Sequence, residues 1–219
     1  MKISKQLSDI NKDVSLLCFT YQADVTRDGA ELWKYIDNKI IKSVENSYTL
    51  ENLAEQKEIK SARETYRAIG KDPSRYRVSS EALIRRILQG KGLYKVNNVV
   101  DCNNLISIQT GLSCGSYDVD KLVGDLVFRI GHNGESYQGI GKDEINIEHL
   151  PVFADNTGAY GSPTSDSRRA MITEQTKNVM TALISFSGVD VLNKYGEIAE
   201  NYISKFLNAK NIQKSLIRS

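Results

Sequence analysis

A polar segment after residue 163 combines hydroxyl groups, a carboxylate and guanidinium groups within a few positions. Its members are Thr164, Ser165, Asp166, Ser167, Arg168 and Arg169. A carboxylate can bind an ammonium group, and a guanidinium can bind a carboxylate or a phosphate through two parallel hydrogen bonds. The segment could therefore bind the two ends of an amino acid or hold a phosphate. The alternative interpretation is a polar connection built around an aspartate turn.

Asparagines gather in the stretch VNNVVDCNN, residues 96–104. Asn97 or Asn98 can cap a helix by accepting from its free backbone N–H groups, and Asp101 adds a carboxylate to the first turn. Capping alone would explain Asn98 and Asp101. Asn103 and Asn104 then lie inside the helix, where asparagine is unfavourable, so we expect them to have side-chain partners across the fold.

Nucleophilic and metal-binding residues are sparse. Cys18, Cys102 and Cys114 form no paired spacing, and His132 and His149 lie among turn residues in an acidic stretch. We therefore predict surface histidines, a buried apolar role for Cys114, and no hydrolase triad, metal site or cofactor. An odd number of cysteines fits a reducing compartment, and no apolar stretch resembles a leader or a membrane span, so the predicted location is cytoplasmic, without a membrane partner.

Positive charge is concentrated in one part of the chain. Residues 57–95 contain eleven bases and four acids, a local net charge of +7, whereas residues 131–160 carry −4 and the whole chain only +2. A locally basic surface attracts polyanions such as a nucleic-acid backbone. The predicted phosphate contacts are Lys60, Arg63, Arg67, Lys71, Arg75 and Arg77. The alternative is a pair of solvated helix faces.

The pattern of apolar residues predicts one α+β domain over residues 1–219. A composition of 40% hydrophobic and 26% charged residues is that of a globular protein able to bury its own core. Helical spacing covers residues 30–45, 50–69, 80–89 with Ser79 as its cap, 97–110 ending before Gly111, and 189–209. Strand-like runs cover residues 16–25, 125–130, 151–154 and 178–186.

The stretch from Val96 to Gly124 resembles a motif in the editing module of the bacterial phenylalanyl-tRNA synthetase β chain, the paired third and fourth domains of that subunit. The matching positions are Asn97, Asn98, Val99, Val100, Asp101, Asn104, Gly111, Asp118, Lys121 and Leu122. Residues 70–86 and 163–180 are similar to flanking segments of the same family, including its free-standing bacterial members. The resemblance covers residues 62–184 and leaves an N-terminal strand and helix and a C-terminal helix as additions.

The resemblance implies a fold of mixed and antiparallel β-sheets packed with helices around an amino-acid pocket. In the synthetase this module hydrolyses wrongly attached tyrosine from phenylalanine-specific tRNA. The family's histidine falls on Gly115 here, its threonine on Asn103, and its Gly-Gly-Glu segment on residues 165–168, so synthetase specificity does not carry over. The pocket residues that we predict are Asn98, Asn103, Asn104, Gly115, Ser116, Thr164, Asp166 and Arg168.

Two functions are consistent with these residues. The first is a tRNA-binding domain that hydrolyses mischarged aminoacyl-tRNA esters in trans, with backbone N–H groups of the 111–116 loop stabilising the oxyanion. The second is a non-catalytic binding protein for an amino acid or a related metabolite; a fold that serves only as an interaction module is a third. The first two functions require that the segment after Gly111 and the turn at Asp166 meet at one cavity.

Overall fold

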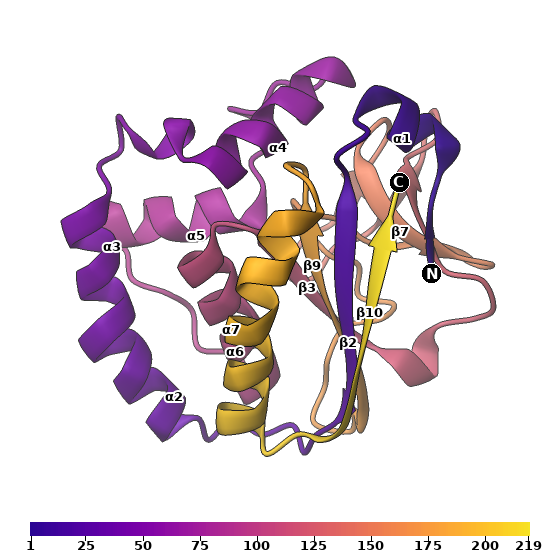
Figure 1. Cartoon of the computed structure of the whole chain (residues 1–219). Coiled ribbons are helices and arrows are strands. Elements are labelled where there is room, and N and C mark those ends of the chain that lie inside the picture. Colours follow the sequence, from indigo (N-terminus) through magenta and orange to yellow (C-terminus); the bar gives the residue numbers. More distant parts are fainter.

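Two four-stranded sheets and a layer of helices make up the chain, and the computed structural model describes all residues 1–219 (Figure 1). The larger sheet is antiparallel. Its strands, in spatial order, are β10 (Lys210–Arg218), β2 (Ser15–Gln22), β9 (Asn178–Ser185) and β3 (Ser113–Asp118). The smaller sheet contains β1 (Lys2–Ile3), β4 (Val127–Ile130), β7 (Pro151–Asp155) and β8 (Gly158–Gly161), and a separate hairpin pairs β5 (Ser136–Gln138) with β6 (Glu144–Asn146).

Three strands of the larger sheet, β2, β9 and β3, are buried on both faces, whereas the edge strand β10 is mostly exposed. The structure is therefore three layers thick. Along β2, Leu17 and Phe19 pack into the helical core, whereas Leu16 and Cys18 pack into the core shared with the smaller sheet. Successive side chains of a strand point to opposite faces, and a strand covered on both sides is therefore apolar at nearly every position. This explains the continuous run SLLCFTY.

The helices cover the face of the larger sheet that lies opposite the smaller sheet. They are α2 (Ala30–Tyr35), α3 (Ile41–Ser47), α4 (Lys57–Ala68), α5 (Ser79–Leu88), α6 (Asn98–Thr110) and α7 (Val189–Leu207). Helix α4 also packs Ala62 and Tyr66 into the core shared with the smaller sheet, and the short α1 (Lys5–Ile10) lies on that side, against β4. In Figure 1, α7 crosses in front of the sheet, and α2 to α5 lie to its side. Gly196 allows α7 to approach β2, because a Cβ atom there would lie 2.7 Å from Leu17 Cδ2.

The first turn of α6 ties three distant segments together. Asn97 caps the helix by accepting from Val100 N–H at 2.9 Å. The buried Asn98 accepts from Thr26 N–H at 3.0 Å and donates to the Asp24 carbonyl at 3.0 Å. Asp101 accepts from the Trp33 indole at 2.7 Å and from Val96 N–H at 3.0 Å. The asparagine-rich stretch thus fixes the position of α6 relative to α2 and to the chain on either side.

The segment between β8 and β9 is held by a partly buried ion pair between Arg169 and Asp155. Arg169 donates two hydrogen bonds to the Asp155 carboxylate, at 2.9 and 3.0 Å, and a third to the Gly158 carbonyl at 2.9 Å. Burial alone would raise the pKa of Asp155, but hydrogen bonds from Arg169, from the Val123 N–H and from Thr157 hold it well below its usual range. Arg169 therefore anchors the polar segment to the end of β7.

The α+β prediction is confirmed, while several element boundaries differ from those expected. The 30–45 helix is interrupted by a π-helical stretch, Ile36–Ile40, and the 50–69 helix begins only at Lys57, after a short 3₁₀ turn at Leu53–Glu55. The prediction of Ser79 as a helix cap is wrong: Ser79 is the first helical residue, and its N–H donates to the Pro163 carbonyl.

The prediction of a loop over residues 111–116 is also wrong, because residues 113–118 form strand β3 and pair with β9 along their length. Strands β1 and β10 and helix α1, at the two ends of the chain, were not predicted. Gly111 ends α6 as expected, with a positive φ of 74°. No helix in the structure is both long and apolar enough to span a lipid bilayer.

We predict that Arg169→Ala destabilises the protein by about 3 kcal/mol, because it leaves the fully buried Asp155 side chain without its charged partner. Urea denaturation measures the change. The matched control is Arg168→Ala, whose exposed side chain donates one hydrogen bond to the Gly139 carbonyl, and there we expect a loss of less than about 1 kcal/mol. Equal losses in the two variants would contradict an anchoring role for Arg169.

Candidate functional site

A cavity of about 490 Å³ lies where α6, the edge strand β3 and the segment before β9 meet. Its walls include Asn103 from α6, Ser116 from β3 and Asp166 from the polar segment, with Arg27 and Glu174 also contributing. A cavity of this volume is in the range of small-ligand sites. The segment after Gly111 and the turn at Asp166 therefore converge on one cavity.

Asp166 places a carboxyl group on the cavity wall. Its Oδ1 accepts from the Tyr117 hydroxyl at 2.9 Å and from Ser162 N–H at 3.2 Å. Burial raises the pKa of this carboxyl to about 6, although both hydrogen bonds favour its charged form. The backbone of Asp166 is also held, because Ile140 N–H donates to its carbonyl at 3.1 Å.

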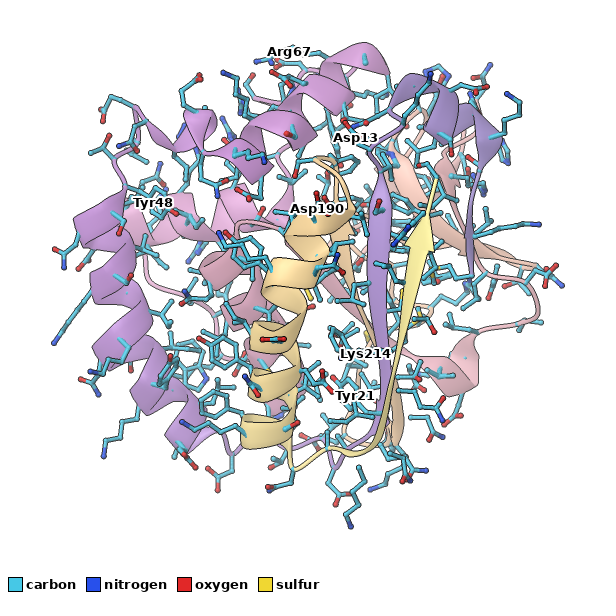
Figure 2. The ribbon with its side chains drawn as sticks, in the orientation of Figure 1. Asp13, Tyr21, Tyr48, Arg67, Asp190 and Lys214 are labelled. Carbon is cyan, nitrogen blue, oxygen red and sulfur yellow. The ribbon has the colours of Figure 1, made fainter.

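Hydroxyl groups form a chain behind the opposite wall. The Ser116 hydroxyl donates to Asn103 Oδ1 at 3.2 Å and lies 2.9 Å from the Thr181 hydroxyl. The Thr181 hydroxyl is in turn 2.9 Å from the hydroxyl of Tyr21, which lies near the C-terminal end of β2 (Figure 2). With its oxygen engaged by Ser116, Asn103 can present its amide N–H₂ to a ligand oxygen.

The Tyr117 phenol fills the space that a side chain at position 115 would need. A Cβ atom built on Gly115 would lie 2.3 Å from the Tyr117 hydroxyl oxygen, and one built on Gly161 would lie equally close. Two glycines thus form the cradle for one buried tyrosine. A side chain at position 115, where the resemblance predicts the family's histidine, would therefore collide with Tyr117, whose hydroxyl donates to Asp166.

Three of the eight predicted pocket residues line this cavity, namely Asn103, Ser116 and Asp166. The other five lie outside it. Asn98 is hydrogen-bonded to the 24–26 segment, and Thr164 is hydrogen-bonded to the Tyr66 hydroxyl at 2.9 Å. The exposed Arg168 side chain donates to the Gly139 carbonyl, and Gly115 packs against the Tyr117 ring. Asn104 is half-buried on α6, outside the cavity.

Sequence reasoning missed the charged pair at the cavity. Arg27 and Glu174 form an ion pair at 2.8 Å, although 147 positions separate them in the chain. Both side chains are mostly exposed, and no local sequence pattern relates them. Because their charges cancel, Asp166 gives the cavity a net charge of −1 when it is ionised.

The three cysteines are buried and free, and burial raises the pKa of each thiol, that of Cys114 well above its usual range. This confirms the prediction that Cys114 is a small buried side chain. Both histidines are exposed, as predicted. No three His, Cys, Asp or Glu side chains gather as a metal site would require.

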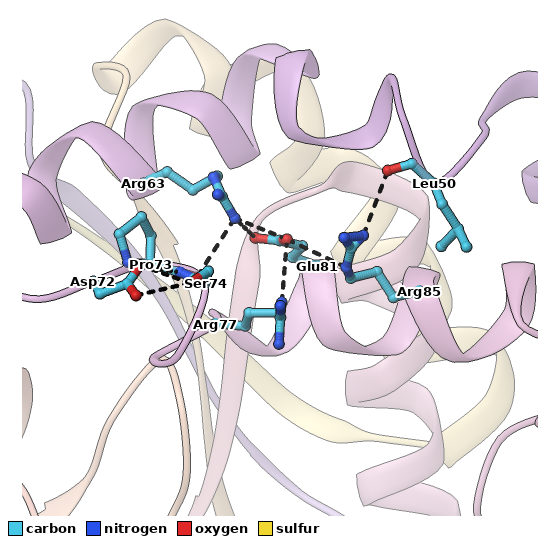
Figure 3. A network of polar contacts seen from close by, with 8 residues as sticks. All are labelled: Leu50, Arg63, Asp72, Pro73, Ser74, Arg77, Glu81 and Arg85. Carbon is cyan, nitrogen blue, oxygen red and sulfur yellow. Dashed lines mark hydrogen bonds and ion pairs between the residues drawn. The ribbon is translucent and has the colours of Figure 1, made fainter.

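The basic segment is organised around one buried carboxylate. Glu81, 1% exposed, lies 3.0 Å from Arg63, 3.7 Å from Arg77 and 3.6 Å from Arg85 (Figure 3). Among the predicted phosphate contacts, Arg63 is therefore mostly buried and engaged, with 16% of its side chain exposed.

The other predicted phosphate contacts lie nearer the surface. Lys60 pairs with Glu55 at 2.8 Å, and Lys71 and Arg75 lie over the Tyr76 ring. Arg67 is exposed on α4, and the Arg77 side chain is 40% exposed.

Comparisons with known proteins point to one family. The family model described as "B3/4 domain" matches residues 61–218, a stretch that includes α7 and nearly all of β10. The phenylalanine–tRNA ligase beta subunit of Malacoplasma penetrans is 27% identical over 119 residues, which are 52% of this chain and 15% of that subunit. The corresponding subunit of a Wolbachia strain is 23% identical over 132 residues, 59% of this chain and 17% of the subunit.

The chain thus spans a small part of these relatives. Among solved structures, an N-terminal fragment of the phenylalanyl-tRNA synthetase beta subunit from Pyrococcus horikoshii aligns with 99% of this chain and 49% of the fragment. Its TM-score is 0.47 and its sequence identity 13%.

We predict that Asp166 makes the free energy of unfolding depend on pH. Because folding raises its pKa from 3.8 to about 6, the folded state binds this proton more tightly. The resulting stabilisation is complete below about pH 4 and is lost as the pH rises through about 6.

Asp166→Asn keeps an oxygen acceptor for Tyr117 but does not titrate. Relative to the wild type, we expect this variant to gain on the order of 2 kcal/mol between pH 4 and pH 7 in urea denaturation. A stability difference that stays constant across this range would show that the carboxyl is not desolvated.

Proposed function

Because the chain belongs to the B3/4 domain family, we propose that it binds the aminoacyl end of a charged tRNA in the Asp166 cavity and hydrolyses the ester there. The charge of the cavity is the observation that carries the proposal. Asp166 is an acidic group without a cationic partner, whereas the one cation at the wall, Arg27, is paired with Glu174. An aminoacyl ester has an ammonium group and no carboxylate, so it matches this charge.

A free amino acid matches the cavity less well. Its carboxylate would require a cation, and Arg27, the one cation at the wall, is already paired with Glu174. The same cavity therefore favours the esterified form over the free zwitterion. This preference would also assist turnover, because the product gains a carboxylate that the site does not neutralise.

Three polar residues of the cavity wall have roles in the proposed reaction. Asp166 binds the α-ammonium group, the Asn103 amide donates to the ester carbonyl oxygen, and the Ser116 hydroxyl orients the attacking water. The water oxygen adds to the carbonyl carbon, and the bond from that carbon to the ribose oxygen then breaks. One water proton goes to the ribose hydroxyl and the other to solvent. Because an ester is already activated, the step needs no strongly basic side chain.

We predict that catalytic amounts of the protein deacylate at least one mischarged tRNA in a panel covering the amino acids. Asp166→Asn should lower kcat/KM for this tRNA at least about tenfold, since it removes the charge that binds the ammonium group. Arg168→Ala, outside the cavity, serves as the control and should retain the activity. Charging levels that stay unchanged across the whole panel would refute hydrolysis. A thermal shift with free amino acids alone would indicate the non-catalytic binding function instead.

The pH dependence provides a second measurement on the same site. Binding requires an ionised Asp166 and a protonated α-amino group, which has a pKa of about 7.7–8.0 in peptides. With the pKa of Asp166 at about 6, affinity for a non-hydrolysable amide analogue of the aminoacyl end should be greatest between about pH 6 and pH 8. In Asp166→Asn, the fall on the acidic side should disappear. An acidic limb that persists in this variant would show that another group binds the ammonium.

A further inference from the structure

A second surface, on the outer side of α5, carries an arginine-lined groove of about 250 Å³. Arg77, Arg85 and Arg86 form its walls together with Ala82 and Gln89, and no carboxylate lines it. Glu81 lies buried beside it and is shared by Arg63, Arg77 and Arg85, so the charges of these guanidinium groups are only partly compensated. The groove is thus a fixed, positively charged surface.

An exposed tyrosine adjoins this groove. Tyr94 is 64% exposed, which is unusual for a large aromatic side chain, and the Arg86 guanidinium lies 4.0 Å from the centre of its ring. An aromatic ring beside guanidinium groups provides what single-stranded nucleic acid requires: a surface on which a base stacks, with cations for the neighbouring phosphates. An acidic peptide would use the cations but has no nucleobase to stack on the ring.

The loop that carries Tyr94 leads directly to the Asp166 cavity. Val96 and Asn97 line that cavity, and Tyr94 is two residues earlier, hence within about 7 Å along the chain. The loop is fixed at both ends, since Arg86 donates to the carbonyls of Lys91 and Gly92, and Val96 N–H donates to Asp101. The groove, the tyrosine and the cavity therefore follow one another along a segment that is hydrogen-bonded at both ends.

We propose that this surface, Arg77, Arg85, Arg86 and Tyr94, binds the single-stranded end of an RNA and directs it to the cavity. The arginines contact phosphates, and the Tyr94 ring stacks on a base. That the RNA bears an aminoacyl group rests on the proposed function; the binding of single-stranded RNA does not. Arg77 is the only one of the predicted phosphate contacts that belongs to this surface. The proposed RNA-binding surface therefore lies on α5 and around Tyr94, and not on α4, where Lys60, Arg63 and Arg67 are located.

The test is equilibrium binding of a labelled single-stranded RNA oligonucleotide and of uncharged tRNA, at several salt concentrations. Tyr94→Ala should weaken both about tenfold or more, whereas Tyr94→Phe, which keeps the ring, should bind like the wild type. Arg77→Gln should make the negative slope of log affinity against log salt concentration shallower by about 0.7, the value for one phosphate contact of a single strand. Arg218→Gln, an exposed arginine on β10, is the charge control and should leave the slope unchanged.

Equal binding by the wild type and Tyr94→Ala, or binding of a blunt RNA duplex as tight as that of the single strand, would overturn the proposal. Thermal unfolding of each variant shows whether it is folded, and we expect little loss of stability because Tyr94 is 64% exposed and outside the core. Deacylation separates this proposal from the previous one. If hydrolysis occurs, Tyr94→Ala should raise KM and leave kcat within about twofold; if hydrolysis is absent, the oligonucleotide measurements alone decide this proposal.

Discussion

Burial of strands β2, β9 and β3 on both faces of the larger sheet is the constraint on which the rest of the structure depends. It requires helices on one side and a second sheet on the other, and it leaves only the edges of the sheet accessible. Strand β3 is such an edge. Its successive side chains enter different layers: Ser116 faces α6 and the cavity, whereas Tyr117 enters the core between the sheets. The cavity forms where this edge meets the segment anchored by Arg169, so one strand can supply groups from both of its faces.

Gly115 and Tyr117 are coupled by their packing. A histidine at position 115 and the present Tyr117 conformation exclude each other, because the phenol occupies the place of the side chain. The Tyr117 hydroxyl instead donates a hydrogen bond to the Asp166 carboxyl group. The structure therefore has a hydroxyl–carboxylate pair, Tyr117 and Asp166, in the part of the fold where the resemblance implies an imidazole.

Glu81 has a comparable role for the basic part of the molecule. A buried carboxylate is stable only if it is well paired, and three arginines from two elements and the turn between them satisfy this need. The side chains of these arginines are consequently held in place instead of moving freely in solvent. Positive charge fixed in this way, with an exposed tyrosine beside it, gives a surface suited to a flexible polyanion, because the protein loses little side-chain entropy on binding.

Local patterns determined much of the framework. The continuous apolar run of β2, the helical spacing before Gly111 and the glycine itself fixed β2 and α6, since these signals depend only on near neighbours in the chain. A helix cap at Asn97 or Asn98, the burial of Cys114 and the exposure of both histidines also followed from residue type, and the structure places the cap at Asn97. The strand β3 was not predicted, because its sequence SCGSYD has little of the apolar alternation typical of strands, and β9 alone makes it extended.

What the tertiary structure decided is which polar residues face one another. Asn98 and Asn103 are of the same type and five positions apart on one helix, yet the first is buried as a structural link and the second reaches the cavity. The pairing of Arg27 with Glu174, and the engagement of Arg63 but not Arg67 by Glu81, depend on contacts between segments far apart in the chain. Sequence determines which groups are present, but their desolvation and their partners, and hence their chemistry, arise only when the layers pack together.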